Sequence, residues 1–121
     1  MIFLDTNVLI KILKGNAETI DKVTNLQAPL SISSITAMEL IYGAKNKQEQ
    51  QKLERFIQLF TTVHVNKSIS NQALKLVKQY AKSHTLDIPD ALIAATALEH
   101  KASLFTYNLQ DFKFIPQLIL I

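Results

Sequence analysis

The chain has 121 residues, of which 48% are hydrophobic, and its 13 Lys and Arg exceed its 10 Asp and Glu for a net charge of +3. This length and apolar content exclude a disordered chain and suit one domain with its own core. The absence of cysteine excludes disulfides, zinc–thiolate sites and cysteine nucleophiles, and it fits a reducing compartment. No signal-peptide pattern follows Met1, and the longest internal apolar stretch is too short to span a bilayer, so we expect a cytoplasmic protein without membrane contact.

The first predicted elements follow directly from the apolar pattern. Ile2–Leu4 predicts a short buried strand, and Thr6–Leu13, apolar at helical spacing, predicts a helix that ends near Gly15. The next predicted elements are a helix over Ala17–Leu26, a strand over Leu30–Ser33, a helix from Thr36 to near Gly43, an amphipathic helix over Gln48–Phe60, a strand over Val63–Val65 and a helix over Ser70–Lys82.

The C-terminal part continues the alternation. Pro89 is predicted to be the first residue of a helix that reaches Glu99. A fourth strand is predicted over Ser103–Thr106 and an edge strand over Leu118–Ile121. Strands that alternate with helices predict an α/β sandwich, with a mainly parallel sheet of four to five strands flanked by helices.

Four carboxylates lie where an apolar segment meets a loop or the start of a helix: Asp5, Glu39, Asp90 and Asp111. Asp5 follows the first strand, and open α/β sheets bind their ligands at the carboxyl ends of strands. Clustered carboxylates repel one another and require a counter-cation, and hard oxygen ligands favour magnesium or manganese. The pattern therefore predicts a metal site for phosphate chemistry.

Each acid also has a purely local explanation. Asp5 is a favoured N-cap for the helix that follows it. Thr36–Glu39 fits a capping box, in which the glutamate bonds back to the helix start. Asp90 lies in a first turn, where the helix dipole favours negative charge, and Asp111 could be an ordinary loop acid. Asp87, expected in the loop before Pro89, competes with Asp90 for a role in the site.

The distribution of charge indicates a polyanionic partner. If four acids are gathered in one site, 13 basic residues face only 6 acidic ones elsewhere, which suits RNA or DNA. Lysines are the main candidates for such contacts, because Arg55 is the only arginine. The candidates for the groove are Lys11, Lys14, Lys45 and Lys47, with Tyr42 and Tyr107 as stacking or core-edge residues. Solvated helix faces are the alternative for each lysine.

The order of four motifs resembles one known family. LDTN, T-x-x-E-L-x-x-G, D-A-L-I-A-A-T-A and T-x-N-x-x-D-F are similar to the motifs of PIN domains, most closely those of VapC-type toxins. The resemblance covers essentially the whole chain and implies a single PIN-like domain, a three-layer sandwich, over residues 1–121. It implies that Asp5, Glu39, Asp90 and Asp111 are the catalytic acids, supported by the polar residues Asn7, Thr106 and Asn108. Tyr107 departs from the family, which often carries Asn or a basic residue there.

The resemblance also implies an activity and partners. It implies an endoribonuclease that uses Mg²⁺ or Mn²⁺ and a metal-activated water, with Asp5 and Asp90 as direct metal ligands. Glu39 and Asp111 would hold coordinated water or orient the nucleophile. A VapB-like antitoxin and a homodimer are further expectations. Exposed apolar positions on Gln48–Phe60 are candidates for the antitoxin groove or the dimer seam, and core packing is the alternative.

Other chemistries fit the chain less well. His64, His84 and His100 are expected in a strand and at helix ends, and no nucleophile elbow surrounds Ser31, Ser33 or Ser34. A dehalogenase-like phosphatase needs an aspartate at the position of Asn7, and a receiver domain needs one between Asp21 and Asp87. The remaining alternatives are a non-toxin PIN nuclease in RNA processing and a catalytically silent PIN-like scaffold that binds RNA or protein.

Overall fold

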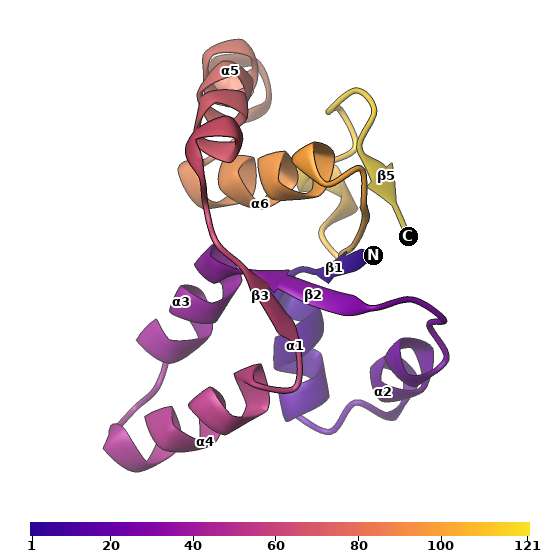
Figure 1. Cartoon of the computed structure of the whole chain (residues 1–121), viewed down its shortest axis with the longest axis vertical. Helices are drawn as coiled ribbons and strands as arrows, with labels where there is room; N and C mark the ends of the chain where they lie inside the picture. The colour runs from indigo at the N-terminus through magenta and orange to yellow at the C-terminus, as the bar shows by residue number, and fades with distance from the viewer.

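A computed structural model describes all 121 residues, and it shows a five-stranded sheet between two layers of helices (Figure 1). In chain order the elements are β1 (Ile2–Leu4), α1 (Thr6–Leu13), α2 (Ala17–Thr24), β2 (Leu30–Ser33), α3 (Ser34–Tyr42), α4 (Lys47–Ile57), β3 (Thr61–Val63), α5 (Lys67–His84), α6 (Ile88–Glu99), β4 (Ser103–Phe105), the 3₁₀ helix η1 (Leu109–Asp111) and β5 (Ile119–Leu120). The strand order is β3-β2-β1-β4-β5, and every neighbouring pair is parallel. The predicted α/β class is confirmed.

The sheet separates two cores because successive strand side chains point to opposite faces. Phe3 of β1 and Leu104 of β4 pack with α5 and α6, and their neighbours Leu4 and Phe105 pack with α1. Figure 1 shows the same division, with α5 and α6 on one side of the sheet and α1 to α4 on the other. The small residues of α6 between Ala91 and Ala97 are buried, so this helix is enclosed on most of its circumference.

The strand order creates a switch point beside β1. The chain builds outward from β1 through β2 to β3, and then returns to place β4 on the other side of β1. Loops that leave two such neighbouring strands diverge, and ligands of open α/β sheets bind in the resulting crevice at the carboxyl ends. Asp5 directly follows β1, and Thr106 directly follows β4.

The start of α3 differs from the prediction. The helix begins at Ser34, two residues earlier than predicted, because Ser33 is the N-cap and its Oγ accepts the Ile35 N–H at 3.1 Å. Thr36 therefore lies inside the first turn, and Glu39 is too far along the helix to bond back to the cap. The capping-box interpretation of Thr36–Glu39 is wrong.

Other boundaries shift by a few residues, through strand pairing for β3 and through a local cap for α6. Strand β3 begins at Thr61, two residues before the predicted Val63, because it is paired in register with Ser31–Ser33 of β2. Helix α6 begins at Ile88, so Pro89 is its second residue, because Asp87 is the N-cap and its Oδ1 accepts the Asp90 N–H at 2.9 Å. The remaining differences are that α2 ends at Thr24, α4 spans Lys47–Ile57, α5 extends from Lys67 to His84, β4 ends at Phe105 and β5 spans Ile119–Leu120.

The apolar residues of α4 and the segment after it turn toward the sheet. Leu53 is buried, and Phe56, Ile57 and Phe60 pack against the core that contains Leu4. Core packing, which was the alternative for these positions, therefore accounts for them, and only Leu59 remains strongly exposed. No helix of the fold combines the length and apolar composition needed to cross a membrane.

Candidate active site

Asp5 is the buried centre of the polar cluster at the switch point. Its side chain is 4% exposed. Oδ1 accepts the Thr6 N–H at 2.9 Å, as expected for the N-cap of α1. Oδ2 accepts hydrogen bonds from Thr106 Oγ1 at 2.8 Å and from Asn7 Nδ2 at 3.1 Å. Asp5 can therefore cap α1 and belong to the polar cluster at the same time, because the cap uses only Oδ1 and the cluster uses Oδ2.

The loop after β4 is joined to the start of α1 by further hydrogen bonds. Asn7 Nδ2 also lies 3.3 Å from Thr106 Oγ1, and Asn7 Oδ1 accepts the Tyr107 N–H at 3.2 Å. The Asn108 N–H donates to Thr106 Oγ1 at 3.0 Å. The supporting residues predicted from the sequence, Asn7 and Thr106, both contact Asp5, whereas Asn108 enters the network through its backbone.

Glu39 reaches the same edge from α3. Its Oε1 accepts a hydrogen bond from Thr6 Oγ1 at 2.7 Å, and Thr6 Oγ1 also lies 3.2 Å from Thr36 Oγ1. Thr6 thus bridges the start of α1 to α3 and orients the Glu39 carboxylate. Thr6 and Thr36 were not predicted as site residues, because their partners are about thirty residues away in the sequence and leave no local pattern.

Asp90 lies in the first turn of α6, as predicted, and is partly buried. Burial raises its pKa from the ordinary 3.8 to about 7, and the negative charge of Asp87 adds to this effect. Asp5, Asp111 and Glu39 raise the same pKa further through charge repulsion. The competing residue Asp87 therefore lies beside the cluster, where it caps α6 and acts on Asp90.

Asp111, on η1, completes the group. Burial raises the pKa of Asp5 above its ordinary value, partly offset by the hydrogen bond from Thr106. Glu39 and Asp111 raise the pKa of Asp5 by repulsion as well. Asp5 and Asp90 therefore lie within electrostatic reach of Glu39 and Asp111, and Asp5 and Glu39 both accept hydrogen bonds from Thr6.

No basic side chain neutralises these acids. The only ion pair in the structure joins Lys22 to Glu18, and it includes none of the four carboxylates. An all-oxygen set of uncompensated carboxylates fits a hard divalent cation such as Mg²⁺ or Mn²⁺. However, no three acidic or histidine side chains converge closely enough to hold an ion as they stand. Charge repulsion between carboxylates acts over longer distances than metal coordination does. A bound ion would therefore have to draw a carboxylate closer, or bind some of the carboxylates through water molecules, which Mg²⁺ commonly retains.

The histidines lie outside the cluster. His84 is the last residue of α5 and stacks on Phe114, and His100 is the C-cap of α6, where its ring contacts Phe3. His64 follows β3 rather than lying in it. The prediction that two of the three lie at helix ends is confirmed.

The fold and the acidic switch-point site define a class of protein that sequence comparison also identifies. The PIN-domain family model matches residues 2–116, and the chain belongs to this family. It is 30% identical to "Ribonuclease VapC19" of Mycobacterium tuberculosis, over 98% of this chain and 97% of that protein. It is 32% identical to the "tRNA(fMet)-specific endonuclease VapC" of Salmonella typhimurium, over 93% of this chain and 90% of that protein.

A solved structure gives the same result. One chain in the crystal structure of VapBC2 from Rickettsia felis, bound to a DNA fragment from their promoter, matches with a TM-score of 0.85. That match is 31% identical and covers 100% of this chain and 98% of the other. The predicted resemblance to VapC-type toxins is confirmed.

Proposed function

We propose that the protein is a metal-dependent endoribonuclease and the toxin of a type II toxin–antitoxin pair. One observation carries the proposal: buried Asp5 and partly buried Asp90 lie near enough to Glu39 and Asp111 to feel their negative charge, and no basic side chain pairs with any of the four. Such an arrangement is electrostatically unfavourable without a cation, so a structural role alone does not account for it. The ribonuclease names of the relatives support the same reaction.

We assign Asp5 and Asp90 as direct ligands of Mg²⁺ or Mn²⁺, because each is buried in part and has a raised pKa that a cation would lower. When bound, a divalent cation activates water and stabilises charge that develops on the phosphate. Thr106 and Asn7 hold Oδ2 of Asp5, so its orientation is set before any ligand arrives. Hydrogen bonds of this kind orient metal ligands and tune their basicity.

Glu39 and Asp111 are proposed to orient the attacking water. Thr6 occupies Oε1 of Glu39, which leaves Oε2 free to accept a hydrogen bond from that water. Asp111 lies on the short η1 helix, on the β4 side of the crevice, so the two acids approach from opposite sides. No histidine is needed as a base in this scheme.

A VapB-like antitoxin is the proposed protein partner, and a homodimer is the proposed oligomeric state. The similar structure from Rickettsia felis is a VapBC2 assembly bound to promoter DNA. Expression of the chain alone is expected to arrest growth, and co-expression with its cognate antitoxin is expected to restore it. Growth unaffected by the active chain would instead support a nuclease of RNA processing.

The nuclease is tested by incubating total cellular RNA with the purified protein and Mg²⁺ or Mn²⁺. Discrete fragments are expected, and they should disappear with EDTA. Asp5→Asn is expected to lower the rate by about a thousandfold, because metal-assisted charge stabilisation contributes several kcal/mol to such reactions. Asparagine is an equally good N-cap, so this substitution removes the charge while α1 keeps its cap.

Asp21→Asn is the matched control, since Asp21 is an exposed residue of α2. It should cut RNA at the wild-type rate. Cleavage that persists in Asp5→Asn would contradict the assignment of the site.

A PIN-like scaffold that binds RNA without cutting is the second candidate. It is favoured by the observation that no three acids converge to hold an ion as they stand. Calorimetric titration of Mn²⁺ into the metal-free protein separates the two. Binding that Asp5→Asn or Asp90→Asn abolishes supports the nuclease, and the absence of binding supports the scaffold.

A further inference from the structure

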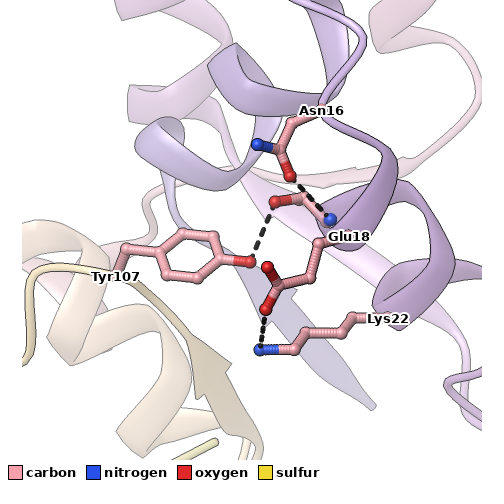
Figure 2. Close-up of polar contacts among 5 residues, drawn as sticks. Asn16, Glu18, Lys22 and Tyr107 are labelled. Carbon is pink, nitrogen blue, oxygen red and sulfur yellow. Dashed lines mark hydrogen bonds and ion pairs between the residues drawn. The ribbon is translucent and has the colours of Figure 1, made fainter.

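Tyr107 connects the acidic network to helix α2. Its backbone N–H donates to Asn7 Oδ1, and Asn7 in turn donates to Asp5. Its hydroxyl lies 2.9 Å from Oγ1 of Thr19, a residue of α2 that is 1% exposed. Figure 2 shows the Tyr107 ring reaching across to α2, close to Glu18 and Lys22. The ring is therefore held at both ends next to the acidic site.

Two lysines from different helices lie against this ring. Lys11 Nζ of α1 is 4.7 Å from the ring centroid, and Lys22 Nζ of α2 is 5.8 Å from it. Both distances fall within the range of cation–π attraction. Each exposed ammonium group therefore lies against the ring, and this contact restricts the freedom of its long side chain.

The charge of this pair is not balanced within the protein. Lys22 forms an ion pair with Glu18 at 3.4 Å, whereas Lys11 has no carboxylate partner. Neither lysine pairs with the four acids of the site. Lys11 is six residues from Asp5, which corresponds to roughly 9 Å along the axis of α1. Lys11 and Lys22 thus lie close to the acidic site but are not part of it.

We propose that Lys11 and Lys22, each held against Tyr107, form a subsite for the phosphate backbone of the RNA strand next to the acidic site. The choice of RNA as the ligand rests on the proposed nuclease function. Ammonium groups bind phosphate as point charges without reading bases, so this subsite positions the strand and contributes affinity rather than sequence specificity. Tyr107 positions the two lysines.

The experiment measures binding of a short fluorescein-labelled oligouridylate to Asp5→Asn protein in EDTA, where no RNA is cut. Lys11→Ala and Lys22→Ala are each expected to weaken binding about two- to fivefold at low salt, the scale of one exposed charge pair. Each should also reduce the slope of log affinity against log salt by about 0.7, the value for one phosphate contact on a single strand. Alanine favours helix, so neither change disturbs α1 or α2.

Lys78→Ala is the matched control, because Lys78 is an exposed lysine of α5 on the opposite helix layer (Figure 1). It should leave affinity and salt slope unchanged. Tyr107→Phe keeps the ring and should retain binding, whereas Tyr107→Leu removes the ring and should lose about as much affinity as one lysine variant. In protein with Asp5 intact, Lys11→Ala and Lys22→Ala should raise KM for RNA cleavage and leave kcat unchanged.

Two outcomes overturn the subsite. One is equal affinity and equal salt slope in Lys11→Ala, Lys22→Ala and Lys78→Ala, and the other is no binding of the oligouridylate by the Asp5→Asn protein at low salt. Lysine-dependent binding by a protein that cuts no RNA when Asp5 is intact would support the subsite while it refutes the nuclease.

Discussion

Two regions of the molecule contribute to its stability in opposite directions. They are the helix layer of α5 and α6 and the carboxyl edge of the sheet. The helix layer contributes to a core cluster of 15 buried residues, and α6 buries its own small side chains there, among them Ala91, Ala94 and Ala97. At the carboxyl edge, buried Asp5 and partly buried Asp90 are repelled by other carboxylates, and the pKa of Asp90 rises to about 7. Packing in one region therefore stabilises a fold that holds unfavourable charge in another. Three substitutions test this division, in order of decreasing effect.

Phe112→Ala should cause the largest loss of stability. Phe112 is 0% exposed within the α5–α6 core and follows Asp111 directly. Removing such a ring leaves a cavity and typically costs about 3–5 kcal/mol of unfolding free energy. Urea unfolding followed by circular dichroism measures the loss as a lower midpoint. Leu109→Ala, at a position 50% exposed, should change stability by less than about 0.5 kcal/mol. Similar losses in both variants would contradict the assignment of Phe112 to the core.

Asp90→Asn should have the opposite effect in metal-free protein at neutral pH. The folded-state pKa of Asp90 is about 7 against an ordinary 3.8, so the folded protein binds this proton more tightly than the unfolded chain. Stability is then highest below the ordinary pKa and falls as the pH rises through about 7. Asp90→Asn should remove that part of the fall and raise Tm at neutral pH.

Thermal unfolding in EDTA across this pH range measures the difference between the two proteins. Asp21→Asn, an exposed change on α2, should keep the wild-type pH dependence. Addition of Mn²⁺ at neutral pH should raise Tm of the wild type more than that of Asp90→Asn. Parallel Tm curves for wild type and Asp90→Asn would show that no unfavourable charge resides at this position.

Ser31→Ala should have the smallest effect, a gain in stability of about 1 kcal/mol, because burial of an unpaired hydroxyl costs about that much. Ser31 Oγ is buried and has no hydrogen-bond partner. Ser33→Ala is a control of opposite sign on the same strand, since Ser33 caps α3, and it should lose about 1 kcal/mol. Chemical denaturation distinguishes the two, and a loss in both would indicate that the Ser31 hydroxyl is bonded.

The sequence predicted elements best where local signals agree with tertiary pairing. Ile2–Leu4, Thr6–Leu13 and Leu30–Ser33 match the observed β1, α1 and β2 to the residue. For α1 the local signals are strong at both ends: Asp5 caps the start, and Gly15, with φ +77°, allows the turn that ends the helix. Strand β3 was displaced because its limits depend on pairing with β2, which a local pattern does not contain.

Glu39 shows how a local motif can mislead about a site. The four residues Thr36–Glu39 satisfy a capping-box pattern, but the cap is Ser33, and Glu39 bonds to Thr6, which is 33 residues away in the sequence. The four acids were grouped only through the order of motifs shared with a family, and their role as a catalytic set stays a prediction. The threonines that orient them, Thr6 and Thr36, have no such signal, and the partner of Tyr107 on α2 is equally invisible before the chain is folded.

The central position of β1 sets the order in which the site can be completed during synthesis. Asp5 emerges from the ribosome early, yet its hydrogen-bond partner Thr106 is 101 residues later, and the strand that carries Thr106 fills the second side of β1. Until β4 has been translated, β1 has an open edge and Asp5 lacks its strongest hydrogen bond. A nascent or truncated chain can therefore display Asp5, Glu39 and Asp90 and still lack a finished site, because the site is completed only after Thr106 has been made.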